Sequence, residues 1–114
     1  MRIEKFEDIK VWQKAKTFSL NIYNSFGANK DLAFKSQILR AGVSIMNNIA
    51  EGFERRGDKE FKHFLFISKG SCGEVRSMLY LAQELEYVPK KKFEELYEQS
   101  VEISKMLSGF IKTL

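Results

Sequence analysis

Apolar residues recur every seven positions along the longest regular stretch of the sequence, from Asp58 to Glu86. Three such series begin at Phe61, Phe64 and Leu65, and each contains one polar residue, which is Ser68, Ser71 and Glu86 respectively. A spacing of seven keeps side chains on one side of an α-helix, because two helical turns take about 7.2 residues. A stripe of this length has to be covered by other helices, so the sequence predicts packed helices.

The same helical spacing returns in three other stretches, which short breaks separate. Asp8 is a candidate N-cap or first-turn acid for the first stretch. Pro89 marks the end of the third, because proline disfavours helix at the residue before it. We therefore expect helices at about residues 8–25, 31–52, 58–86 and 90–113. Short loops make consecutive helices antiparallel, so the expected fold class is all-α: a single domain, residues 1–114, forming an antiparallel up-down four-helix bundle.

The composition argues against a membrane-spanning, secreted or disulfide-bonded protein. No apolar run approaches the roughly 20 residues that a membrane-spanning helix needs, and the first residues do not resemble a signal peptide. The one cysteine, Cys72, cannot form a disulfide within the chain. We therefore expect a cytoplasmic protein without a membrane partner.

The net charge of +4 is unevenly spread along the sequence. Residues 1–57 hold ten basic and six acidic side chains, whereas residues 58–114 hold nine of each. This asymmetry points to a polyanionic partner such as RNA or DNA. The candidate phosphate-binding residues are Lys10, Lys14, Lys16, Arg55, Arg56, Lys90, Lys91 and Lys92. Each of them could equally be a solvated surface charge. Aromatic residues interleaved with the charges are not visible, so backbone contact is the expected mode.

A stripe of short polar side chains follows the second predicted helix, beside its apolar seam. Asparagine is a poor helix former, so Asn47 and Asn48 in mid-helix need a tertiary explanation. We expect a buried polar network, satisfied within the chain or across a subunit interface, in which Gly70 and Gly73 allow close helix approach. Its members would be Arg40, Ser44, Asn47, Asn48, Glu51, Ser71 and Glu74. The alternative interpretation is a ligand-binding or catalytic cleft.

Metal and nucleophilic chemistry find no support in the residue types present. His63 and Cys72 are the only histidine and cysteine, and their spacing of nine puts them on different helix faces. A metal site needs three or four convergent ligands, and a catalytic triad needs a histidine base. We expect His63 on the helix surface, Cys72 in the core, and neither a cofactor nor enzyme activity.

Four consecutive apolar residues, Phe64 to Ile67, point in every direction from one helix. At least one of them has to face water or cover a neighbouring chain. Burying one such side chain is worth roughly 1.5–3 kcal/mol, which favours a homo-oligomer.

The segment from Arg40 to Gly52 reads RAGVSIMNNIAEG. It resembles the signature of the 23S rRNA intervening-sequence proteins, a bacterial family of four-helix bundles. The opening, from Phe6 to Ala15, and the segment from Phe61 to Glu74 resemble the same family, so the likeness covers nearly the whole chain. Gly73 stands where the family usually has a larger residue.

The resemblance implies more than the residue pattern does. The related accessory variability determinant of diversity-generating retroelements forms a ring-like pentamer with a basic surface, and it binds nucleic acid and a reverse transcriptase. By analogy this chain would form a ring-like homopentamer, and five chains of +4 would carry +20.

Three functions therefore remain open. The first is a non-enzymatic homo-oligomer that binds the backbone of RNA or DNA. The second is an adaptor that docks a reverse transcriptase, another polymerase or another protein, with little nucleic-acid binding of its own. The third is a small enzyme, which would need the polar stripe to line an open pocket.

Overall fold

The computed structural model describes residues 2–114, and four α-helices make up most of that span. They are α1 (Lys10–Phe26), α2 (Leu32–Glu54), α3 (Asp58–Glu84) and α4 (Lys90–Lys112). A short 3₁₀ helix, η1 (Phe6–Asp8), precedes them. No strand occurs within residues 2–114, so the fold is all-α.

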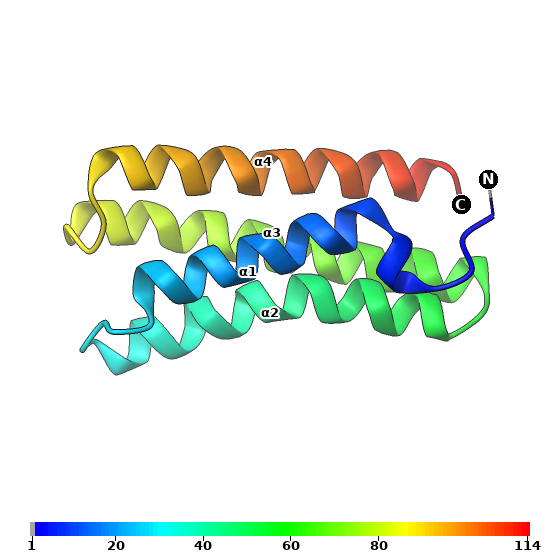
Figure 1. Ribbon diagram of the computed structural model, residues 1–114, viewed down its shortest axis with the longest axis horizontal. Helices are drawn as coiled ribbons and strands as arrows, with labels where there is room; N and C mark the ends of the chain where they lie inside the picture. Colours follow the sequence, from blue (N-terminus) through cyan, green and yellow to red (C-terminus); the bar gives the residue numbers. More distant parts are fainter. Residues whose placement is uncertain (1) are drawn as a thin grey trace.

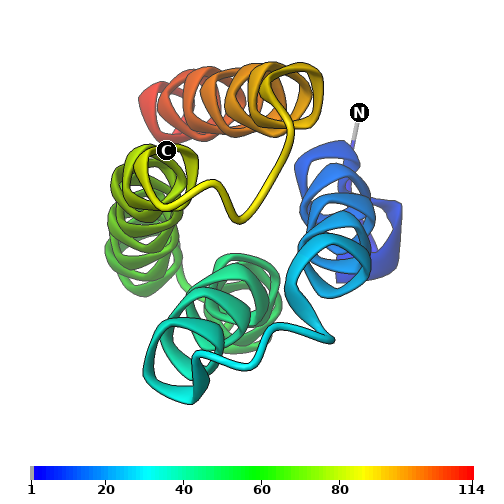
Figure 2. The same cartoon turned by 90° about the vertical axis from the view of Figure 1, so that its left-hand side faces the viewer.

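The helices run alternately up and down along a molecule of 43 × 22 × 19 Å (Figure 1). Seen end on, they surround one central axis, and each lies beside its neighbours in sequence (Figure 2). α1 also packs against α4, which closes the bundle. Both termini and the α2–α3 connection lie at one end, and the other two connections lie at the opposite end (Figure 1).

The core is formed by the apolar stripes of all four helices. Its largest fully buried side chains are Phe18, Ile22, Phe26, Ile38, Ile45, Ile49, Leu65, Val75, Leu79, Leu96, Ile103 and Leu107. Cys72 is buried among them, as expected, and His63 is exposed on the surface.

The first helix begins two residues later than expected, and Asp8 does not cap it. Residues Phe6–Asp8 form the 3₁₀ turn instead, and Ile9 occupies the N-cap position without a side-chain hydrogen bond. The ring of Phe6 packs edge-on against Trp12 at 5.1 Å, and Gln13 Nε2 donates to Glu7 O at 2.8 Å. These contacts fold the entering chain back onto α1, which pulls Asp8 away from the helix end.

The third helix ends two residues earlier than expected, at Glu84. Glu86 adopts a left-handed conformation with φ of 58°, and Tyr87 N–H then donates to Ala82 O at 2.8 Å. This left-handed residue ends the regular hydrogen bonding before Pro89 is reached.

Candidate nucleic-acid interface

The up-down topology gathers the excess positive charge at one end of the bundle. Residues 2–17, 45–71 and 101–114 share the end that holds the α2–α3 connection, drawn at the right of Figure 1. These residues include twelve Lys and Arg against eight Asp and Glu, a net charge of +4. The residues of the other half, 18–44 and 72–100, include seven of each. We call the first the basic end.

The eight predicted basic residues do not form one surface. Lys10, Lys14, Lys16, Arg55 and Arg56 belong to the basic end, where they are exposed. Lys90, Lys91 and Lys92 begin α4 at the opposite end of a molecule 43 Å long. On one chain the eight residues therefore lie in two separate places.

Three of these cations already have a carboxylate partner. Lys14 Nζ lies 3.3 Å from Glu102, Arg55 Nη2 lies 3.0 Å from Glu51 Oε2, and Lys92 Nζ lies 3.4 Å from Glu95. All three pairs are solvent-exposed, and exposed ion pairs are typically worth under about 1 kcal/mol. A phosphate can therefore compete for each of these cations.

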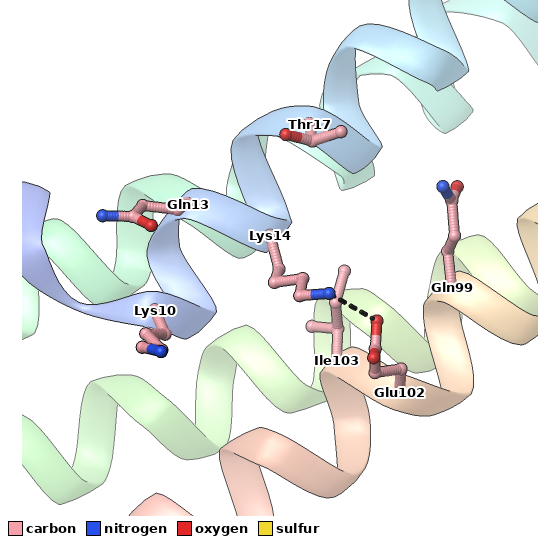
Figure 3. Close-up of a pocket in the computed structure, with 7 residues that line it drawn as sticks. All are labelled: Lys10, Gln13, Lys14, Thr17, Gln99, Glu102 and Ile103. Carbon is pink, nitrogen blue, oxygen red and sulfur yellow. Dashed lines mark ion pairs between the residues drawn. The ribbon is translucent and has the colours of Figure 1, made fainter.

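An open groove between α1 and α4 brings together Lys10 and Lys14 (Figure 3). Gln13 and Thr17 of α1 and Gln99, Glu102 and Ile103 of α4 complete its lining. Figure 3 shows the Lys14 ammonium turned across the groove to the Glu102 carboxylate. Glu102 offsets part of the positive charge, so this groove is less attractive to a phosphate than its two lysines suggest.

The polar stripe of α2 forms a smaller network than expected, and its members Ser44, Asn48 and Ser71 are half-buried. Ser44 Oγ and Ser71 Oγ are 2.8 Å apart and join α2 to α3. Asn48 Nδ2 donates to both the carbonyl and the hydroxyl oxygen of Ser44, at 2.8 and 2.9 Å. Ser68 Oγ, fully buried, donates to Ile45 O at 2.7 Å. These bonds stabilise the α2–α3 contact.

The other predicted members of the network are exposed in the single chain, so they are not buried within it. Arg40, Asn47, Glu51 and Glu74 all lie on the surface. Arg40 and Glu74 line a shallow groove over Ser44 and Ser71, whereas Glu51 pairs with Arg55. Among the described residues, Ser44 is the member of the α2 stripe that hydrogen-bonds to α3.

The glycines of α3 also differ from expectation. An added Cβ would meet nothing within 4 Å at Gly70, and only the Arg76 guanidinium at 3.9 Å at Gly73. The close approach lies at Gly52 of α2, where a Cβ would stand 2.6 Å from Phe64 Cβ and 3.0 Å from Phe61 Cδ1. The packing therefore requires glycine at Gly52, leaves Gly70 facing open space, and brings no other helix against Gly73.

Residue-by-residue interpretation of the sequence missed the cations that α3 and α4 contribute to the basic end. They are Lys59, Lys62, Lys69, Lys105 and Lys112. Their half of the sequence is neutral overall, which hid them. The expected up-down topology could have revealed them, because it places the start of α3 and the end of α4 at the same end of the bundle.

The described part of the chain, residues 2–114, contains no group of three or more His, Cys, Asp or Glu side chains able to hold a metal ion. Burial raises the pKa of the Cys72 thiol to about 11, and its Sγ donates to Ser100 O at 3.1 Å. Such a thiol is neutral near pH 7, as expected for a core residue. Within the same residues, no helix is long and apolar enough to cross a membrane.

Four helices, closed into an up-down bundle with a basic end, define a four-helix bundle protein. The family model of the 23S rRNA-intervening sequence proteins matches residues 7–109. The chain therefore belongs to that family, which confirms the resemblance of the Arg40–Gly52 segment.

Its fold is similar to a crystal structure of a protein of unknown function from the S23 ribosomal protein family of Bacteroides thetaiotaomicron. The two chains are 31% identical, with a TM-score of 0.82, over 90% of this chain and 95% of the other. Among curated proteins there is no significant match.

Proposed function

We propose that this protein is a non-enzymatic homo-oligomer, a pentameric ring by analogy, whose basic surface binds the backbone of RNA or DNA in an RNA- or retroelement-associated role. The observation that carries the proposal is the basic end, which holds the whole net charge of +4. Charge gathered in one region attracts a polyanion more strongly than the same charge evenly spread.

Exposed apolar side chains on α3 support self-association. Ile67, Leu81 and Leu85 have exposed fractions of 39%, 50% and 47%. Helical spacing places them on the side of α3 that carries Ser71 and Glu74, beside α2. Burying each of these side chains between chains would contribute roughly 1.5–3 kcal/mol. Assembly would also multiply the basic ends and bring them close together.

The same apolar edge favours a second candidate, the adaptor that docks a polymerase or another protein. In that case Ile67, Leu81 and Leu85 would be covered by the partner instead of by a second copy. The adaptor predicts weak nucleic-acid binding by the protein alone and retention of one specific partner in a pull-down.

The test combines light scattering with fluorescence anisotropy at several salt concentrations. The probes are single-stranded RNA and duplex DNA, each labelled. We expect an oligomer that gains mass with nucleic acid at low salt, with a Kd that rises steeply with salt. Charge reversal of Lys10, Lys14, Arg55 and Arg56 should weaken binding, and reversal of Lys90 and Lys91 is the control at the opposite end.

Two results would contradict the proposal. One is a wild-type protein that binds neither probe at low salt. The other is an affinity that does not change with salt. A stable monomer would remove the summed charge and favour the adaptor.

A further inference from the structure

One side of α3 carries four cations, and the carboxylates nearest to them in the sequence, Asp58 and Glu60, flank Lys59. Lys59, Lys62, Lys69 and Arg76 are spaced by three, seven and seven residues, which keeps them on one side of the helix. Within residues 2–114 none of the four takes part in an ion pair, although three other cations do. We call this surface, from Lys59 to Arg76, the cationic face of α3.

The acidic residues of the same stretch lie on the edge of α3 that faces α2. Glu74 lines the groove that Arg40 and Ser71 share, and Glu60 lies fourteen residues before it on the same edge. The opposite edge faces α4, because Cys72 bonds to Ser100 and Tyr80 packs against Tyr97. From Glu60 to Arg76 the helix thus separates its charges, with the cations toward solvent and α4 and the carboxylates toward α2, whereas Asp58 lies four residues before Lys62 on the cationic side.

An aromatic ring and two glycines complete the cationic face. Phe66 lies between Lys62 and Lys69 and is 55% exposed, and it takes part in no aromatic pair within the described residues. Gly70 and Gly73 follow it: Gly70 faces open space, and a Cβ at Gly73 would meet only the Arg76 guanidinium, at 3.9 Å. Glycine destabilises a helix interior, yet here no packing within the chain requires it. Because glycine has no side chain, another chain can approach the helix backbone closely at these two positions.

We infer that single-stranded nucleic acid lies along the cationic face of α3, with its phosphates on the four cations and a base stacked on Phe66. This inference rests on the proposed function and assigns it a surface. The α-helical rise of 1.5 Å per residue makes the face about 26 Å long, enough for several nucleotides. Exposed aromatics stack on bases of any sequence when the strand is single, whereas a duplex hides its base faces.

Charge complementarity favours a polyanion over a second copy of this chain on this face. Two copies meeting through it would oppose four cations with four cations, and like charges at an interface are unfavourable. The apolar edge around Ile67 and Leu85 is a separate surface on the other side of the helix. Self-association can therefore use that edge and leave the cationic face open.

The experiment measures anisotropy of a labelled single-stranded RNA of about 12 nucleotides, and of a duplex DNA of the same length, against salt. The double variant Lys62→Gln/Lys69→Gln is compared with Lys90→Gln/Lys91→Gln, which makes the same charge change at the far end. We expect the first to bind the RNA at least about tenfold more weakly, with a salt slope shallower by about 1.4, since each phosphate contact on a single strand contributes about 0.7. The control should bind as the wild type does.

Phe66→Ala separates stacking from charge. It should weaken binding of the single strand by about 5- to 150-fold, from the affinity of one stacked base. Its salt slope and its binding of the duplex should stay those of the wild type. Circular dichroism and thermal melting confirm that every variant is folded.

The outcomes separate this inference from the proposed function. If the α3 variants bind like the wild type while the Lys10, Lys14, Arg55 and Arg56 reversals lose binding, the surface is wrong and the function stands. If the wild type binds neither probe, the proposed function fails first. If Lys62→Gln/Lys69→Gln breaks the oligomer into smaller particles, the face is a subunit contact and the inference is overturned.

Discussion

The hydroxyl of Tyr87 donates a hydrogen bond of 2.6 Å to Asp31 Oδ2, which joins the α3–α4 connection to the start of α2. The other carboxylate oxygen of Asp31 accepts from Phe34 N–H at 3.2 Å and so caps α2. The ring of Phe34 then packs edge-on against Tyr87, with centroids 5.0 Å apart. One carboxylate thus fixes both connections at this end of the bundle.

The link should make stability depend on pH. The Tyr87 hydrogen bond, followed by the Phe34 N–H, holds the pKa of Asp31 below its usual value. A carboxyl with a lowered folded pKa contributes stability above its unfolded pKa, near 3.8, and loses it as pH falls through the folded pKa. Tyr87→Phe should therefore melt at a lower temperature than the wild type at neutral pH. The difference should shrink as the solution is acidified below pH 3.8.

Stability at alkaline pH tests the same hydrogen bond from the side of Tyr87. The hydrogen bond to Asp31 raises the pKa of Tyr87, so its contribution is present below the usual tyrosine pKa of 10 and is lost as pH rises through the folded value. Melting curves of both proteins across the pH range measure this. Two coincident curves would show that the link contributes nothing to the fold, and a constant difference would show that its contribution does not depend on pH.

Asn48 and Asn47 offer a matched pair of substitutions on one helix. Asn48→Ala removes both bonds to Ser44 and should lower the free energy of unfolding by about 1 kcal/mol. Asn47 is exposed, so Asn47→Ala should raise it by up to about 0.5 kcal/mol, because alanine is the better helix former. Urea unfolding measures both, and equal effects would contradict the assignment of Asn48 alone to the buried network.

The glycines of α2 and α3 should respond to alanine in opposite directions. At Gly52 the new Cβ would stand 2.6 Å from Phe64 Cβ, so Gly52→Ala should destabilise the protein by about 1–3 kcal/mol. At Gly70 nothing lies within 4 Å, and Gly70→Ala should stabilise it by about 1 kcal/mol. A stabilised Gly52→Ala variant, measured by thermal melting, would mean that α2 and α3 separate easily there.

Cys72 should be chemically inert until the bundle opens. Its side chain is fully buried, and burial raises the pKa of the thiol to about 11. Alkylation by iodoacetamide near pH 8 needs both access and the thiolate, so the native protein should react at the rate of its opening. Mass spectrometry over time, with and without urea, follows the reaction. Rapid labelling of the native protein would show that the α3–α4 contact opens readily.

The sequence determined the helices and the core for a simple reason. Apolar spacing of three, four and seven fixes which side of each helix is covered, and Leu65, Leu79 and Leu107 are fully buried accordingly. The helices end within two residues of the expected positions. The small shifts at Asp8 and Glu86 come from a 3₁₀ turn and a left-handed residue, which periodicity does not encode.

Only the tertiary structure decided which polar side chains are exposed and where on the surface the charge gathers. Whether a polar residue at the edge of an apolar stripe is buried depends on the rotation and distance of the next helix. Ser44 therefore reaches Ser71 of α3, while Asn47 and Glu74 stay exposed. The antiparallel topology likewise moved the charge excess from one half of the sequence to one end of the bundle, because it pairs the start of α1 with the end of α2.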